Sequence, residues 1–139
     1  KKRKLGYRVF VLLVDGECQE GSVWEAGYAA PSFGLDNLVF IVDANKLQYD
    51  GYSEKILSIE SMGQAFSNLG WDVDVVDGHD VASLLGSLSQ NRNKPLFLIA
   101  KTVKGKGVSF MEDVKEWHHG RLTEPLYNQA MAEVEAMHD

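Results

Sequence analysis

The sequence contains only one cysteine, Cys18, so the chain cannot form an internal disulfide bond. The absence of disulfides fits a reducing compartment, and we therefore expect a cytoplasmic protein. No apolar run approaches the ~20 residues that a helix needs to span a bilayer, so we expect no membrane segment. The first residues also contain no hydrophobic segment of the kind found in signal peptides.

Positive charge is scarce as well. The chain has 14 Lys and Arg against 20 Asp and Glu, which gives a net charge of −6. Nucleic-acid-binding proteins usually carry a basic stripe, whereas the one basic run here, residues 1–4, is typical of a solvated tail. No G-x-G-x-x-G follows the first predicted strand, which argues against a simple nucleotide-binding domain. We therefore expect no nucleic-acid partner.

Apolar runs alternate with helical patterns along the chain. Strands are predicted at residues 8–14, 38–42, 71–76 and 95–100, and helices at residues 22–30, 58–69, 81–90 and 124–138. This alternation predicts an α/β fold with a mostly parallel sheet and helices on both faces. The sequence has no initiator Met and starts almost directly on a strand. We therefore expect residues 1–139 to form a single domain that is incomplete at its N-terminus and needs a partner.

The ends of the predicted elements carry local signals. The run Arg8–Val14 is continuously apolar, as expected of a strand that is covered on both faces. Ser22 and Glu25 have the spacing of a capping box, and Pro31 should close the helix that they open. Core-facing positions are expected at Val23, Ala26, Tyr28 and Ala30 in this helix, at Ile59, Met62, Phe66 and Leu69 in the next, and at Leu126, Ala130, Val134 and Met137 in the last. Asp50-Gly51 predicts a turn.

Polar residues follow the first two predicted strands directly. Asp15-Gly16 comes after the first strand, and Asn45 lies 30 residues after Asp15, at the end of the second. Ligands of open parallel sheets bind beyond the carboxyl ends of the strands, and carboxylate and amide oxygens suit Mg²⁺ or Ca²⁺. The helix after Gly21 could favour a diphosphate at its N-terminus. The alternative is that Asp15 only forms a turn and that Asn45 only adopts a left-handed conformation.

Four segments together resemble the transketolase family, and more narrowly the N-terminal subunit of split, two-subunit transketolases. They are VDGECQEGSVWEAGYAA, LDNLVFIVDANKLQYDG, WDVDVVDGHD and AKTVKGKGVSFMEDVKEWHHG, and they extend from about Tyr7 to Gly120. Many thiamine enzymes share a motif in which GDG is followed by an asparagine, one helix and one strand later. The stretches ECQEGSVWEA, LDNL and LQYDG in the same register are specific to transketolases.

The resemblance implies the diphosphate-binding domain of the thiamine diphosphate-binding fold. The implied cofactors are thiamine diphosphate and Mg²⁺, with Ca²⁺ or Mn²⁺ as possible substitutes. The implied reaction transfers a two-carbon ketol unit from a ketose phosphate to an aldose phosphate. The implied partner is a C-terminal transketolase subunit or a pyrimidine-binding domain, in a dimer or heterotetramer. The alternatives are another thiamine diphosphate enzyme, such as a deoxyxylulose-phosphate synthase or a dehydrogenase subunit, and a diverged, non-catalytic scaffold subunit.

The resemblance also implies roles for individual residues. The metal ligands would be the side chains of Asp15 and Asn45 and the backbone carbonyl of Leu47. The cofactor-binding residues would be Asp15, Gly16, Glu17, Asn45, Lys104, His118 and His119. Catalytic roles fall to Glu20, which would support a glutamate of the partner chain across the interface, and to the histidine of the Trp-His motif. We assign that histidine to His118, because KGKGVSFMEDVKEWH needs no insertion, and counting back from Gly120 gives His119 instead.

Two features depart from the family pattern. The first glycine of GDG is Val14 here, and the upstream family segment that carries further histidines is absent from the sequence. Other nearby residues have plainer interpretations. Cys18 is expected to be passive, Asp43 to act as a turn cap or to position the second loop, and His79-Asp80 to form a turn and a helix start. Residues 104–120 have little periodicity and are expected to form a long functional loop.

Overall fold

The computed structural model describes residues 6–48, 51–52 and 58–137 of the chain. The elements in chain order are β1 (Val9–Val14), the short 3₁₀ helix η1 (Glu17–Gln19), α1 (Gly21–Ser32), β2 (Leu38–Ala44), β3 (Leu47–Gln48), β4 (Gly51–Tyr52), α2 (Ile59–Leu69), β5 (Asp72–Asp77), α3 (Val81–Leu88), β6 (Leu96–Lys101), the 3₁₀ helix η3 (Lys115–His118) and α4 (Glu124–Ala136). None of these helices is long and apolar enough to cross a membrane.

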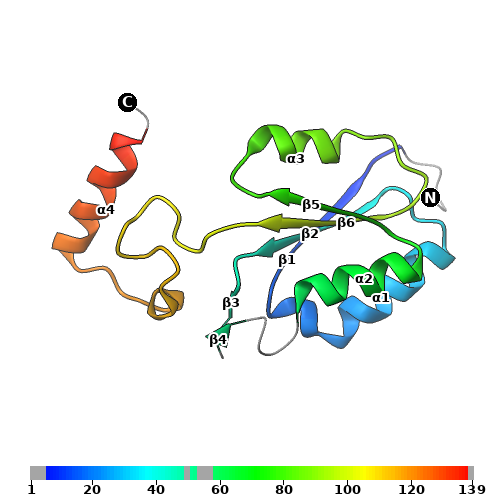
Figure 1. Cartoon of the computed structure of the whole chain (residues 1–139), viewed down its shortest axis with the longest axis horizontal. Helices are drawn as coiled ribbons and strands as arrows, with labels where there is room; N and C mark the ends of the chain where they lie inside the picture. Colours follow the sequence, from blue (N-terminus) through cyan, green and yellow to red (C-terminus); the bar gives the residue numbers. More distant parts are fainter. Residues whose placement is uncertain (1–5, 49–50, 53–57, 138–139) are drawn as a thin grey trace.

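The centre of the fold is a four-stranded parallel sheet with the strand order β1-β2-β6-β5. Helices α1 and α2 lie on one face of this sheet and α3 lies on the other (Figure 1). The predicted α/β fold, with a mostly parallel sheet and helices on both faces, is therefore confirmed. Because all four strands run in the same direction, their carboxyl ends meet at one edge of the sheet. The loops that follow β1, β2 and β6 begin at that edge.

The larger core lies between the sheet and helices α1 and α2, and Phe66 is at its centre. Its ring is completely buried and packs against Phe97, Trp71 and Trp24, with ring centroids 4.3, 5.2 and 5.7 Å away. A side chain at Gly27 would place its Cβ 2.6 Å from the Phe66 ring, so this helix position must remain a glycine. A smaller core of Val39, Leu96 and Leu98 lies under α3.

Helix α1 differs from the prediction at both ends. It begins after Glu20, whose side chain makes no capping hydrogen bond, rather than through a Ser22 capping box, and it continues to Ser32 with Pro31 inside it. Pro31 has no N–H, so the carbonyl of Gly27 one turn earlier loses its helical donor. The indole N–H of Trp71 donates to that carbonyl at 2.7 Å instead. A tertiary hydrogen bond thus compensates for the proline, which the local pattern could not show.

The prediction that the first strand is covered on both faces is wrong. Strand β1 is at the edge of the sheet. Leu13 is buried against α1 and α2, whereas Phe10 and Leu12, on the other face, are 52% and 68% exposed. The physical reason is that α3 covers residues of β2, β5 and β6 but none of β1. Strand β5 was predicted to be a half-exposed or edge strand, and it is the opposite edge.

The remaining helices follow the sequence signals more closely. Ser58 caps α2 by accepting from the Ser61 N–H at 3.3 Å, and Gly70 ends it in the left-handed conformation, φ 104°. Asp80 caps α3 in the same way, so the predicted turn and helix start at His79-Asp80 is confirmed.

Two predicted core stripes are only partly correct. In α4, which lies away from the sheet (Figure 1), Ala130 is buried but Met137 is exposed. Tyr28, predicted to pack in α1, is 68% exposed. The predicted end of α4 at His138 and the turn residue Asp50 lie outside the described residues.

Candidate functional site

Asp15 and Asn45 lie at the carboxyl ends of two paired strands. Asp15 directly follows β1 and Asn45 directly follows β2, and the last register pair of these strands is Val14 with Asp43. Both side chains are buried, with exposed fractions of 1% for Asp15 and 3% for Asn45. Burying a carboxylate is costly unless positive charge or hydrogen bonds compensate for it. The fold therefore brings a buried anion and a buried amide to the same edge of the sheet.

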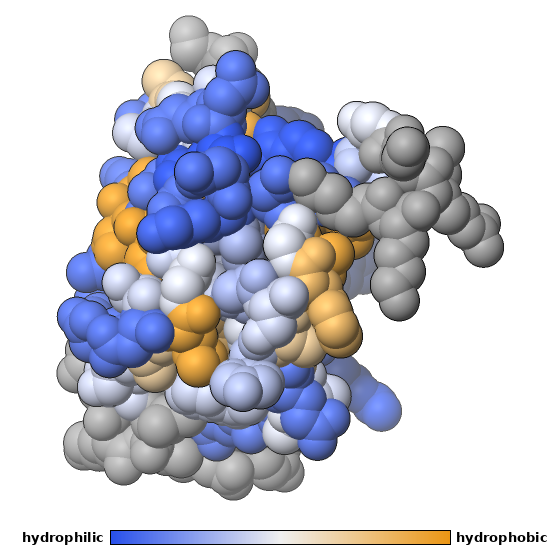
Figure 2. Space-filling view, turned by 90° about the vertical axis from the view of Figure 1, so that its right-hand side faces the viewer, coloured by the Kyte–Doolittle hydropathy of each residue, from blue (hydrophilic) through white to orange (hydrophobic). Residues whose placement is uncertain are grey.

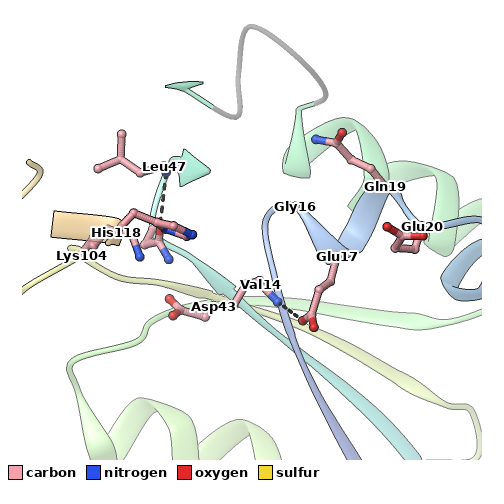
Figure 3. A pocket seen from close by; sticks show the side chains of 10 residues that line it. Val14, Gly16, Glu17, Gln19, Glu20, Asp43, Leu47, Lys104 and His118 are labelled. Atoms are coloured by element: carbon pink, nitrogen blue, oxygen red, sulfur yellow. Dashed lines mark hydrogen bonds between the residues drawn. The ribbon is translucent and has the colours of Figure 1, made fainter. Parts of the chain in front are cut away.

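A cavity of about 490 Å³ opens at this edge (Figure 3), which is within the usual range for small-molecule and cofactor sites. The residues that line it are Val14, Gly16, Glu17, Gln19, Glu20, Asp43, Asn45, Leu47, Lys104 and His118. Most residues with predicted site roles are among them. Asp15 does not line the cavity, although both of its chain neighbours do, and His119 does not line it either.

The loop after β2 is shaped by Asn45 itself. The Asn45 side-chain oxygen accepts the Leu47 N–H at 3.1 Å, and the residue between them, Lys46, has a left-handed backbone with φ 68°. The alternative interpretation placed the left-handed residue at Asn45, which is wrong. A carbonyl oxygen has two lone pairs, so the Asn45 amide oxygen retains a second acceptor position.

Glu17 has a contact that the sequence did not indicate. Its carboxylate accepts the backbone N–H of Val14 at 3.0 Å (Figure 3). Val14 is the last residue of the edge strand β1, so this N–H points away from β2 and has no ladder partner in the described part of the sheet. Glu17 thus completes the hydrogen bonding at the end of β1. In the sequence, the only sign of this bond was the short separation between the end of the strand and the acidic residue Glu17.

Two further residues at or near the cavity, Asp43 and Cys18, interact with neighbouring residues. The Thr102 hydroxyl donates to the Asp43 carboxylate, so Asp43 joins the end of β2 to the segment after β6. Cys18 is completely buried, and burial, followed by the negative charges of Asp15 and Glu17, raises the pKa of its thiol to about 12. Cys18 therefore remains protonated at neutral pH, as a passive residue would.

The opposite wall of the cavity carries basic groups. Lys104 and His118 come from the long segment between β6 and α4 and reach the cavity together (Figure 3). Desolvation, followed by the positive charges of Lys104 and His119, lowers the pKa of His118. The long segment was predicted to be a functional loop, and it contributes these two lining residues.

The other end of the sheet offers a much weaker site. Figure 2 shows that end, where hydrophilic and intermediate residues cover most of the surface. A cavity of about 240 Å³ lies there and includes Arg92. The guanidinium of Arg92 already pairs with Asp74 and, at 3.4 Å, with Asp72. Its charge therefore serves an internal ion-pair network, and the carboxyl end of the sheet remains the better candidate.

A comparison with models of protein families shows to which family the chain belongs. The family model described as "Transketolase, thiamine diphosphate binding domain" matches residues 3–135. The chain belongs to the transketolase family. Among curated relatives of this family, it is 43% identical over 137 residues to an apulose-4-phosphate transketolase subunit of Phocaeicola vulgatus, covering 96% of this chain and 49% of the relative.

Further comparisons agree with this assignment. The chain is 35% identical to a 6-deoxy-6-sulfo-D-fructose transketolase subunit of a Clostridium species, over 91% of this chain and 47% of that protein. It thus spans about half the length of these two curated relatives. Among solved structures, it resembles the transketolase of Campylobacter jejuni with a TM-score of 0.87 at 28% identity, covering 94% of this chain and 21% of that one. The chain is therefore a transketolase-family N-terminal domain.

The resemblance predicted a glycine at position 14, and the structure places Val14 at the cavity. The Val14 residue lines the cavity and is 42% exposed. Its side chain therefore forms part of the wall, and a glycine at this position would leave more space. On the opposite wall, His118 lines the cavity while His119 does not, and their rings cross at 90° with centroids 4.7 Å apart. His118 is thus the histidine of this pair that lines the cavity, and its assignment to the Trp-His motif stays a prediction.

We expect the substitution Lys104→Ala to raise the pKa of His118. The lysine charge disfavours the protonated imidazole, and its removal takes away one of the causes of the low pKa. The pKa should return only part of the way to its usual value, because desolvation remains the largest cause. An NMR titration of the His118 ring protons measures the change. Lys106→Ala is the matched control, since Lys106 pairs with Glu112 at 3.7 Å, and an unchanged His118 pKa in Lys104→Ala would contradict the coupling.

Proposed function

We propose that this chain provides the diphosphate- and metal-binding part of a thiamine diphosphate-dependent transketolase. The single observation that carries the proposal is a cavity lined by the buried Asn45 amide on one side and by Lys104 and His118 on the other, with the buried Asp15 carboxylate directly beside it between two lining residues. This arrangement offers oxygen ligands for a cation and positive charge for an anionic substrate or cofactor. We further propose that residues 1–139 act as one domain and that the protein works in the cytoplasm.

The residues present fit a magnesium–diphosphate group. The Asp15 and Asn45 side chains and the Leu47 carbonyl would hold Mg²⁺, for which Ca²⁺ or Mn²⁺ could substitute. Among the residues that the structure describes, no cluster of three or more His, Cys, Asp or Glu could hold a metal. Mg²⁺ takes few protein carboxylates and completes its shell with water and phosphate oxygens, so the proposed site contains a single carboxylate. The backbone N–H of Gly16 would bind the diphosphate.

The other residues of the cavity would orient the reactants. Thiamine diphosphate, when bound, supplies the carbon nucleophile for cleavage and formation of the carbon–carbon bond. Lys104 and His118 would face the diphosphate and the bound sugar phosphate, and the low pKa of His118 keeps its ring neutral to a lower pH, so that it can accept a proton or a hydrogen bond from a sugar hydroxyl. Glu17, one of whose carboxylate oxygens accepts the Val14 N–H, would contribute by holding the loop in place.

We propose a complementary chain as the partner. It would be a C-terminal transketolase subunit or a pyrimidine-binding domain, in a dimer or heterotetramer, and it would bring the glutamate that acts on the cofactor. Glu20 lines the cavity and would support that glutamate across the interface. The relatives named as subunits support this proposal, because such names imply further subunits.

The test is a substrate panel with the full-length protein and its complementary chain. We expect ketol transfer from a ketose phosphate to an aldose phosphate that requires both thiamine diphosphate and Mg²⁺. Activity with pyruvate instead would indicate a deoxyxylulose-phosphate synthase or a dehydrogenase subunit. Calorimetry that detects no cofactor binding in the presence of the partner would indicate the non-catalytic scaffold, for which the Val14 side chain in the cavity wall is the specific observation.

A further inference from the structure

The segment between β6 and the cavity is held from two sides. On the β2 side, the Thr102 N–H donates to the Ala44 carbonyl at 3.2 Å, and the Thr102 hydroxyl donates to Asp43. On the β5 side, the Gly78 N–H donates to the Lys101 carbonyl at 2.7 Å. A Cβ at Gly78 would lie 2.5 Å from a methyl carbon of Thr102. The turn after β5 therefore packs directly on residues 101 and 102.

His79 makes the last of these contacts. The backbone N–H of Val103 donates to the Nε2 atom of His79 at 2.8 Å. In this contact the Nε2 atom is the acceptor, so a side chain without an acceptor at this place could not make the bond. The backbone N–H of His79 donates to the Asp77 carboxylate at 2.8 Å, which fixes the turn that presents the ring. His79 itself lies outside the cofactor cavity.

This hydrogen bond matters because Val103 lies between the end of β6 and Lys104. The β6 ladder ends at Lys101, so the N–H groups beyond it need partners outside the sheet. Val103 receives its partner from a side chain 24 residues earlier in the chain. The next residue is Lys104, which lines the cavity together with Asn45 and His118. The bond thus holds the backbone immediately before the basic wall of the site.

We propose that His79 is a positioning residue for Lys104, an inference that rests on the proposed function of the cavity. His79 acts through the Val103 backbone and touches neither the diphosphate nor the sugar. Loss of the acceptor nitrogen lets residues 103–104 move away from the cavity while the rest of the fold stays in place. A purely structural role for His79 would instead lower the stability of the α3 turn and leave the cofactor affinity unchanged.

The test compares two substitutions in the full-length protein assembled with its complementary chain. His79→Gln keeps an acceptor oxygen at about the reach of Nε2, whereas His79→Leu removes the acceptor and keeps a side chain of similar bulk. Hydrogen exchange by mass spectrometry on peptides that span residues 102–104 reports the Val103 N–H directly. We expect exchange about fivefold faster in His79→Leu, the effect of one ordinary hydrogen bond, and little change in His79→Gln. Calorimetry should show thiamine diphosphate binding in the presence of Mg²⁺ weakened by a similar factor only in His79→Leu.

A double-mutant cycle with Lys104→Ala establishes whether the effect passes through Lys104. The two substitutions should be non-additive, so that His79→Leu causes no further loss of affinity once Lys104 is absent. Additive losses, or unchanged exchange and affinity in His79→Leu, would overturn the proposal. A wild-type assembly that binds no thiamine diphosphate would overturn the proposed function itself. The exchange data would then decide separately whether His79 holds residue 103.

Discussion

Replacing Asp15 by alanine is expected to abolish the Mg²⁺-dependent binding of thiamine diphosphate. The carboxylate is almost completely buried at the end of β1, next to the cavity that contains Asn45 and Leu47. Among these proposed ligands only Asp15 carries a charge, so its removal leaves Mg²⁺ with neutral oxygens alone. Affinity should fall by more than about a hundredfold, beyond the loss typical of residues that only support a metal ligand. Calorimetry of the assembled protein, with and without Mg²⁺, measures the change.

The matched control is Asp43→Asn. It neutralises a carboxylate that, unlike Asp15, itself lines the cavity, and it keeps an oxygen that can accept from the Thr102 hydroxyl. We expect a much smaller loss of affinity than in Asp15→Ala. Thermal unfolding gives a second readout, because a ligand that binds only the folded state raises Tm. The ligand-induced rise should disappear in Asp15→Ala and persist in Asp43→Asn. Equal losses of affinity in the two variants would contradict a role of Asp15 as a metal ligand. They would show that Asp15 contributes only to the general charge near the cavity.

The substitution Phe66→Ala is expected to lower the free energy of unfolding by about 3–5 kcal/mol. The ring is completely buried at the centre of the larger core and contacts aromatic rings from β6, from α1 and from Trp71, just before β5. Its loss removes apolar burial and leaves a cavity that the surrounding rigid sheet cannot fill. Tm should fall by roughly 10 °C or more in a domain of this size. Urea unfolding monitored by circular dichroism measures both the midpoint and its slope.

Tyr28→Ala serves as the control for this core substitution. Tyr28 is also aromatic and lies in helix α1, but it is largely exposed. Its replacement should change the free energy of unfolding by no more than about 0.5 kcal/mol. A loss in Phe66→Ala as small as that in Tyr28→Ala would show that the aromatic cluster contributes little to stability, contrary to the packing described above.

The element types and the two polar strand ends beside the cavity could be predicted from the sequence, because both depend on local patterns. Ser58 and Gly70 mark the ends of α2 through preferences of single residues for capping and for the left-handed conformation. Asp15 and Asn45 each interrupt the pattern at the end of an apolar run, and parallel strands necessarily bring such ends to the same edge. The resemblance added the residue roles, which remain proposals until they are measured.

The strand order could not be predicted in the same way. The run Arg8–Val14 has the apolar composition of a strand covered on both faces, but in the described structure it pairs on one side only. The composition of a strand shows how well it tolerates burial. It does not show which strands and helices will pack against it. The exposed N–H of Val14 and its bond to Glu17 follow from that edge position. This bond therefore became visible only once the order of the strands was known.

The sequence by itself determined the α/β fold, the two polar strand ends and the family, because these follow from short patterns of residue type. Only the tertiary structure decided which distant groups meet. Trp71 donates to the Gly27 carbonyl that Pro31 leaves without a helical donor, and His79 accepts from Val103 beside the cavity. Such bonds join residues 44 and 24 positions apart, and a local pattern carries no information about a partner at that separation. Their existence depends on how the helices and turns pack against the sheet.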